Sequence, residues 1–245
     1  MELSIIIPLH NEAGRLPGCM ARVISWARIN LVNTEIILVP NGCVDNTLEL
    51  CRRYEGQYQV NRLIDVVCIP LNVRGKGAAV RAGMLAASAP LIYMADVDLS
   101  SPVKEIFKFW DVLDAGYDGA IGSRALRPEQ VKTSLKRRMI GRTFHALVSA
   151  LVPGVQDTQC GFKMFRASVA KDLFSRAQID GMAFDVEILY LARQLDYRIL
   201  EMPVTWTAGK ESRVNLMGDS WQMLRDVLKI PGLHGSTLAK EELPA

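Results

Sequence analysis

Four short apolar runs, each rich in β-branched residues, recur about every thirty positions in the first hundred residues of the chain. They span residues 3–8 (LSIIIP), 35–40 (EIILVP), 63–70 (LIDVVCIP) and 91–96 (LIYMAD). Helical patterning fills the stretches between them, at residues 15–30, 45–54 and 76–88. Buried strands joined by helical crossovers predict an α/β fold, with a mainly parallel central sheet, helices on both of its faces and a Rossmann-like first half.

The second half of the chain has weaker patterns. We expect a short strand at residues 119–123, a long helix at 131–152, a helix at 185–194, a strand at 198–206 and a last helix at 216–230. A chain of 245 residues, 49% of them hydrophobic, can bury one large core. We therefore predict a single domain over residues 1–230 and a flexible tail at 231–245.

The composition also limits the cellular context. No apolar run approaches the ~20 residues of a membrane span, and the chain begins in a strand instead of a signal peptide. The five cysteines are scattered and form no C-x-x-C pair, which argues against a disulfide framework or a structural zinc site. We expect a cytoplasmic protein with reduced thiols.

Positive charge is concentrated in one segment. Residues 124–142 hold seven basic residues and one acidic residue, a net charge of +6, so the remainder carries −3 of the total of +3. Apolar residues recur at helical spacing from residue 131 to 151, with basic residues between them. Such a helix can lie on an anionic membrane surface, although a core-packing helix with solvated charges fits the pattern equally well.

An acidic pair follows the fourth apolar run. Asp96 and Asp98 stand at positions i and i+2, so on a strand they would project from one face. Hard divalent cations such as Mg²⁺ or Mn²⁺ prefer carboxylate oxygens together with phosphate oxygens of a substrate. The pair predicts a metal-bound diphosphate site, with ordinary turn chemistry as the alternative.

Polar loops follow the other strands at the same edge of the sheet. In open α/β sheets ligands bind at the carboxyl ends of the strands, so residues 9–12, 41–45, 71–77 and 96–98 should surround one crevice. Lys76 stands between two glycines there, which suits close approach of a phosphate, although the glycines also fit a simple helix-entry turn. A dinucleotide-binding site is disfavoured, because the G-x-G-x-x-G turn is missing.

The motifs in these loops resemble those of family 2 glycosyltransferases with the GT-A fold. The first half contains I-I-I-P-L-H-N-E, P-N-G-C-V-D-N-T, N-V-R-G-K-G-A-A-V-R-A-G-M and A-D-V-D. The second half contains G-S-R, D-T-Q-C-G-F-K, F-D-V-E and S-R-V, which resemble the branch of polyprenyl-phosphate glycosyltransferases that includes dolichyl-phosphate glucosyltransferases and mannose synthases. The chain departs from the family at residues 40–43, where Pro-Asn-Gly-Cys replaces the usual Asp-Asp-Gly-Ser.

This resemblance implies an inverting, metal-dependent transfer of a hexose from a nucleotide sugar, with UDP-glucose expected, to a polyprenyl phosphate. Residues 1–123 would bind the donor and residues 124–230 the acceptor. The expected donor-binding residues are Pro8, Leu9, His10, Asn11, Glu12, Asn41, Lys76, Gly77, Asp96, Val97 and Asp98. Asp96 and Asp98 would hold Mg²⁺ or Mn²⁺, and His10 would stack on the nucleobase unless its role is structural. Arg124, Arg138, Arg142 and Arg213 would bind acceptor or phosphate.

The nature of the acceptor determines what catalysis requires. A polyprenyl phosphate is mostly ionised at neutral pH and needs no general base, whereas an alcohol acceptor does. We hypothesise that Asp157 lies at the reaction centre and Lys163 beside the acceptor phosphate, with Asp185 and Glu187 as further carboxylates near the sugar.

Two other functions remain open at this stage. A soluble glycosyltransferase could act on an alcohol in a small molecule, a glycan or a modified nucleobase, and a binding module could hold the nucleotide sugar without catalysis. Nucleic acid is a disfavoured partner, because the basic segment contains few aromatic residues. The expected location is cytoplasmic, or peripheral on the inner face of a membrane.

Overall fold

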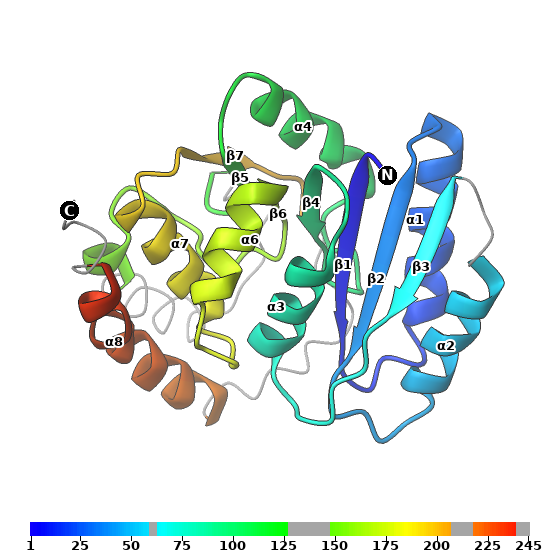
Figure 1. The fold of residues 1–245 in the computed structure, drawn as a ribbon, viewed down its shortest axis with the longest axis horizontal. Coiled ribbons are helices and arrows are strands. Elements are labelled where there is room, and N and C mark those ends of the chain that lie inside the picture. Colours follow the sequence, from blue (N-terminus) through cyan, green and yellow to red (C-terminus); the bar gives the residue numbers. More distant parts are fainter. Residues whose placement is uncertain (59–62, 127–147, 207–217, 239–245) are drawn as a thin grey trace, which may run out of the picture.

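The fold is organised around one seven-stranded sheet with the strand order β3-β2-β1-β4-β6-β5-β7. The computed structural model describes residues 1–58, 63–126, 148–206 and 218–238. The strands are β1 (Leu3–Leu9), β2 (Thr34–Pro40), β3 (Ile64–Cys68), β4 (Leu91–Met94), β5 (Gly119–Ser123), β6 (Lys163–Arg166) and β7 (Ile199–Pro203). Strands β1 to β4 pair in parallel, as the sequence predicted, so their carboxyl ends meet at the lower edge of the sheet in Figure 1.

Strand β6 is the exception to the parallel arrangement. It runs antiparallel to both β4 and β5, and β5 then pairs in parallel with β7. Its four residues, KMFR, include two charges in a very short run, which is why the apolar pattern did not reveal it. The sheet is thus mixed but mostly parallel, with the antiparallel strand between its two parallel parts.

Helices cover both faces of the sheet (Figure 1). They are α1 (Leu16–Asn30), α2 (Thr47–Tyr58), α3 (Lys76–Ala86), α4 (Ile106–Asp114), α6 (Ala167–Arg176), α7 (Phe184–Gln194) and α8 (Gly218–Leu238), with a short 3-10 helix, η1 (Val103–Glu105), before α4. One apolar core packs α1, α2 and α4 against one face, and a second packs α3, α6, α7 and α8 on the other. Residues of β1 alternate between the two cores, as expected for a strand buried on both sides.

The helices of the structure differ from the predicted ones at several points. Helices α4 and α6 were not predicted, and α8 continues to Leu238, so residues 231–238 of the predicted flexible tail are helical. His234, inside that stretch, is only 1% exposed. Of the helix predicted at 131–152, residues 148–151 are helical and 131–147 lie outside the described residues. No helix in the described parts of the chain is long and apolar enough to cross a membrane.

Candidate active site

Asn41 joins the carboxyl ends of the first three strands. Its side chain Nδ2 donates to the carbonyl of Leu9 at 2.8 Å, and its Oδ1 accepts the amide of Gly75 at 3.0 Å. A carboxylate could accept from Gly75 but could not donate to Leu9, which gives a physical reason for Asn at this position. Asn41 is only 3% exposed and holds the loops together, while its predicted contact with the donor stays a prediction.

The loops after β1 and β2 are joined by further hydrogen bonds. Asn11, in the left-handed backbone region at φ 55°, accepts the amide of Val44 at 2.8 Å. The amide of Glu12 donates to Thr47 Oγ1 at 2.7 Å, and His10 Nδ1 lies 2.8 Å from the carbonyl of Asn41, so it is the donor.

The structure brings His10, Asn11 and Glu12 together, half-buried, at the predicted edge of the sheet. Pro8 and Leu9, by contrast, are buried inside β1. Their side chains therefore do not reach the surface, and their predicted contact with the donor stays a prediction.

The glycines on either side of Lys76 face protein backbone. A Cβ at Gly75 would lie 2.7 Å from the carbonyl oxygen of Asp180, and one at Gly77 would lie 2.3 Å from that of Ile179. The Asp180 carbonyl also accepts the amide of Ala78, in the first turn of α3. These glycines thus allow the loop before α7 to pack closely, and the donor contact of Gly77 stays a prediction.

The acidic pair lies on a turn and not on the strand. Strand β4 ends at Met94, and the amide of Leu99 donates to the carbonyl of Asp96 at 3.0 Å. Asp98 Oδ1 accepts the amide of Ser100 at 2.9 Å, and its carbonyl accepts from the Arg22 guanidinium at 3.0 Å. Asp96 and Asp98 therefore do not lie on a strand, so the expectation that both carboxylates project from one strand face does not apply to them. Val97, between them, is buried.

Lys76 and Asp96 form a partly exposed ion pair at this edge. Lys76 Nζ lies 2.7 Å from Asp96 Oδ1, and the Asp96 side chain is 40% exposed. Burial favours a raised pKa for Asp96, but the charge and hydrogen bond of Lys76, together with the charges of Lys163 and Arg124, outweigh burial, and the pKa is lowered. Asp96 is thus an ionised group that faces several cations. A Cβ at Gly161 would lie 2.0 Å from Asp96 Oδ2, so glycine at that position makes room for the carboxylate.

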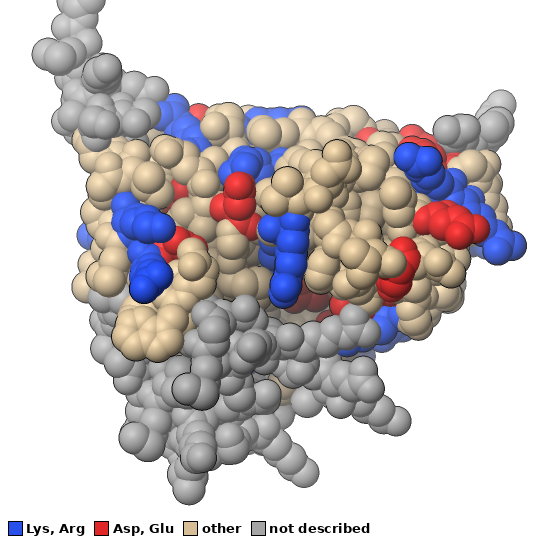
Figure 2. Space-filling model, turned by 90° about the horizontal axis from the view of Figure 1, so that it is seen from below, with Lys and Arg blue, Asp and Glu red and all other residues tan. Residues whose placement is uncertain are grey.

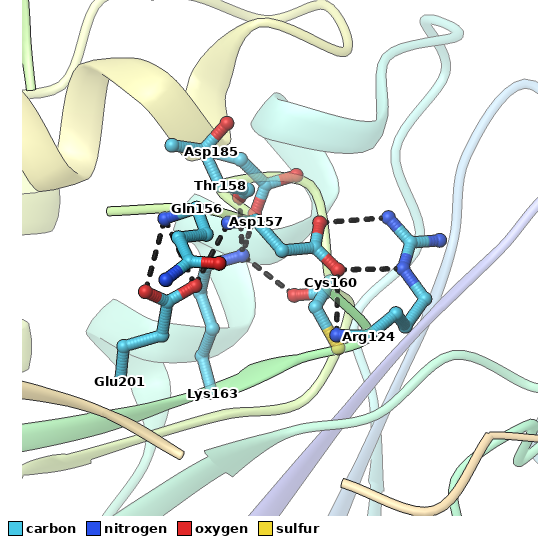
Figure 3. Close-up of polar contacts among 8 residues, drawn as sticks. All are labelled: Arg124, Gln156, Asp157, Thr158, Cys160, Lys163, Asp185 and Glu201. Carbon is cyan, nitrogen blue, oxygen red and sulfur yellow. Dashed lines mark hydrogen bonds and ion pairs between the residues drawn. The ribbon is translucent and has the colours of Figure 1, made fainter. Parts of the chain in front are cut away.

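Arg124 and Asp157 form a second ion pair (Figure 3), and Arg124 lies near enough to Asp96 to help lower the pKa of that carboxyl. The Arg124 side chain donates to both oxygens of Asp157, at 2.7 and 2.8 Å, and its backbone amide adds a third bond at 2.9 Å. Burial tends to raise the pKa of Asp157, yet the hydrogen bonds and charge of Arg124 outweigh it and lower that pKa. Asp157 is therefore a fixed carboxylate and a poor proton acceptor near neutral pH.

Lys163 and Asp185 form a buried pair. Lys163 Nζ donates to Asp185 Oδ1 at 2.5 Å and to the carbonyls of Thr158 and Cys160 at 3.0 and 2.7 Å, which uses all three protons of an ammonium group. Both side chains are at most 2% exposed, and burial raises the pKa of Asp185. In this structure the lysine holds the loop before β6 against α7, and its predicted place beside an acceptor phosphate stays a prediction.

Glu187 is also structural. It is fully buried, accepts the amides of Gln178 and Ile179 at 2.8 and 2.9 Å, and lies 2.8 Å from His234 Nε2 of α8. The prediction that Glu187 lies near the sugar stays a prediction. Its role is to tie the loop before α7 to α8.

Some predicted residues lie outside the described chain. Arg138, Arg142 and Arg213, with most of the basic segment, belong to residues 127–147 and 207–217. Within the described ranges, no group of three His, Cys, Asp or Glu side chains could hold a metal ion by itself. Figure 2, which views the edge where the parallel strands end, shows basic and acidic side chains interspersed on this face.

Sequence reasoning missed two residues that support the site. Glu201 of β7 accepts the backbone amides of Gln156 and Asp157, and Arg22 of α1 holds the carbonyl of Asp98. A single Glu within a strand and a single Arg on a helix carry no motif. Only the fold reveals what they contact.

Comparison with known proteins identifies one matching family and two similar proteins that share a name. The model of the family described as Glycosyl transferase family 2 matches residues 4–174. A Dictyostelium discoideum protein named dolichyl-phosphate beta-glucosyltransferase is 34% identical over 242 residues, covering 93% of this chain and 73% of that protein. The human protein of the same name is 33% identical over 247 residues, covering 94% of this chain and 74% of the relative.

Solved structures share the fold at much lower identity. Mannosyl-3-phosphoglycerate synthase from Rubrobacter xylanophilus superposes with a TM-score of 0.70 at 13% identity, covering 96% of this chain and 75% of that one. Glucosyl-3-phosphoglycerate synthase from Mycobacterium tuberculosis, in complex with Mn²⁺, UDP-glucose and phosphoglyceric acid, gives 0.68 at 17% identity, covering 94% and 80%. These similarities concern the fold alone.

Proposed function

The chain belongs to glycosyl transferase family 2, and from this membership we propose that it transfers glucose from UDP-glucose to a polyprenyl phosphate. It is a glycosyltransferase with the GT-A fold, as its motifs predicted. The observation that carries the proposal is the similarity to proteins named dolichyl-phosphate beta-glucosyltransferase over more than nine tenths of the chain. In the proposed reaction a phosphate oxygen of the acceptor attacks C1 of glucose, the bond from C1 to UDP breaks, and the configuration inverts.

A divalent metal ion fits the acidic turn. Asp96 and Asp98 provide two carboxylates, and the absence of a third acidic or histidine ligand among the described residues suits a site completed by the donor's phosphates. Manganese in the complexed Mycobacterium tuberculosis neighbour supports this choice. When bound, the metal would stabilise the charge of the departing UDP. Lys76 remains charged, because Asp96 raises its pKa against the effect of burial, so it can also neutralise the diphosphate.

The state of Asp157 favours a phosphate acceptor over an alcohol. An alcohol would need a general base, but both oxygens of Asp157 already accept from Arg124 and its pKa is lowered. A phosphate acceptor needs no base. We infer that Asp157 orients Arg124, whose side chain is 32% exposed, toward the acceptor phosphate. A binding module without catalysis would have no use for this second charged pair beside the donor site.

A comparison of acceptors tests this function. Purified protein with UDP-glucose and Mn²⁺ is incubated with polyprenyl phosphate, with the corresponding polyprenol or with 3-phosphoglycerate, and glucosylated products are quantified. We expect glucosylation of polyprenyl phosphate at least about a hundredfold faster than of the other two, because only this acceptor combines an ionised nucleophile with a lipid chain. Preferential glucosylation of polyprenol or of 3-phosphoglycerate would contradict the proposal.

The outer face of α8 supports action at a membrane surface. Trp221 and Leu228 are 67% and 61% exposed, and Arg225 and Lys229 lie exposed on the same helix. Figure 1 shows α8 at the lower left, toward the side where the parallel strands end. Exposed Trp and Leu with adjacent basic residues are typical of helices that lie on anionic membranes. We propose that this face contacts the membrane that holds the acceptor.

Replacing both Trp221 and Leu228 by Ala should weaken binding to anionic vesicles about tenfold, because the apolar contact is lost. Vesicle flotation with phosphatidylglycerol-containing and neutral lipid measures the change. Ile29→Ala provides a matched control, since Ile29 is 77% exposed but lies at the end of α1, near the opposite edge of the sheet. Equal vesicle binding by the double variant and the wild type would refute contact through α8.

A further inference from the structure

Glu201 holds the backbone of the loop that carries Asp157. This residue lies on β7, where it pairs with Ile121 of β5. Its carboxylate accepts the amide of Gln156 at 2.9 and 3.1 Å and the amide of Asp157 at 2.8 Å. These two successive amides, in a loop without regular structure, thus share one carboxylate.

The same loop is held from the other side by Arg124. Figure 3 shows Glu201 and Arg124 on opposite sides of Asp157. Arg124 follows β5, and Glu201 lies on the neighbouring strand, so two adjacent strands fix the backbone and the side chain of one residue. Trp206, three residues beyond the end of β7, supports the arrangement, because the Arg124 guanidinium lies over its ring at 5.9 Å from the centroid.

We propose that Glu201 is a positioning residue for the reaction and acts through Asp157. This inference rests on the proposed function, because it takes Asp157 to lie at the reaction centre. A carboxylate that accepts hydrogen bonds from two backbone amides holds the loop more firmly than a single hydrogen bond between neutral groups would. Without it, Asp157 and the guanidinium that it orients would move relative to the acceptor phosphate, and small displacements of such groups greatly reduce turnover.

The test uses Glu201→Ala and Glu201→Gln in the full-length chain. Turnover at saturating UDP-glucose and polyprenyl phosphate, the Kd for UDP-glucose with Mn²⁺ and the melting temperature are measured. Glu55→Ala is the matched control, since Glu55 also accepts a backbone amide, that of Cys68 at 2.9 Å, but does so on α2. A merely structural role of Glu201 would make the two Ala variants alike in all three measurements.

We expect Glu201→Ala to lower kcat about ten- to a hundredfold, with the donor Kd changed by less than about twofold. Glu201→Gln retains one acceptor oxygen and should keep an intermediate kcat. Glu55→Ala should keep the wild-type kcat. Wild-type kcat in Glu201→Ala, or an equal loss in Glu55→Ala, would overturn the proposal.

A double-variant cycle separates this inference from the proposed function. If Glu201 acts through Asp157, Glu201→Ala should cause little further loss of kcat in an Asp157→Asn background. The full additional loss in that background would show that Glu201 acts independently of Asp157. Undiminished kcat in Asp157→Asn alone would instead contradict the placement of Asp157 at the reaction centre.

Discussion

Asp98→Asn should lower glucosyl transfer at least about a thousandfold, because it removes one of the two negative charges available to a divalent metal. The substitution preserves the size of the side chain, and the amide oxygen of Asn can still accept the hydrogen bond from Ser100. The turn should therefore persist while metal affinity falls. Transfer rates measured across a Mn²⁺ titration should show a higher half-saturating metal concentration together with a lower maximal rate.

The control for this variant is Asp114→Asn, which makes the same chemical change at an exposed position in α4. It should retain wild-type activity and metal dependence. Both variants should melt within a few degrees of the wild type, since Asp114 is exposed and Asn in place of the half-buried Asp98 can still accept the Ser100 hydrogen bond. Wild-type transfer by Asp98→Asn would exclude this carboxylate from metal and donor binding.

Lys163→Met should lower the free energy of unfolding by about 3–5 kcal/mol, because it leaves the charge of Asp185 buried without its partner. Asp185 is 1% exposed, so water cannot readily replace the ammonium group. The carbonyls of Thr158 and Cys160 lose their donor as well. Urea unfolding followed by circular dichroism measures the change.

Two comparisons show whether the loss comes from the buried pair. Lys229→Met removes a lysine that is 59% exposed and pairs with Asp226, and it should cost less than about 1 kcal/mol. The double variant Lys163→Met with Asp185→Leu should recover part of the stability, because no unpaired charge remains. Unchanged stability in Lys163→Met would contradict the structural role of this lysine.

The first half of the fold was predictable because its strands are buried on both faces. Continuous apolar runs such as residues 3–8 carry a strong signal, and β1 and α1 agree with their predictions to within one residue. Strand β6 has no such signal, since half of its residues are charged. Its place between β4 and β5 follows from pairing with strands that begin far earlier in the sequence.

The candidate site was only partly predictable for a related reason. The strand order predicted Lys76 and Asp96 at one edge of the sheet and the motifs singled out Arg124 and Asp157, and in the structure the two ion pairs lie near each other. A motif does not reveal whether a charged side chain will be buried against a distant partner. Lys163 meets Asp185, 22 positions away, and so belongs to the interior.

The most direct test of the central claim is mass spectrometry of the reaction products. Purified protein with Mn²⁺, polyprenyl phosphate in detergent and a panel of UDP- and GDP-sugars is compared with the Asp98→Asn variant. The account predicts a glucosyl phosphate of the polyprenol from UDP-glucose, strongly reduced in the variant. A lipid product from another sugar, or release of UDP and free glucose without a glycolipid while UDP-glucose binds normally, would contradict it.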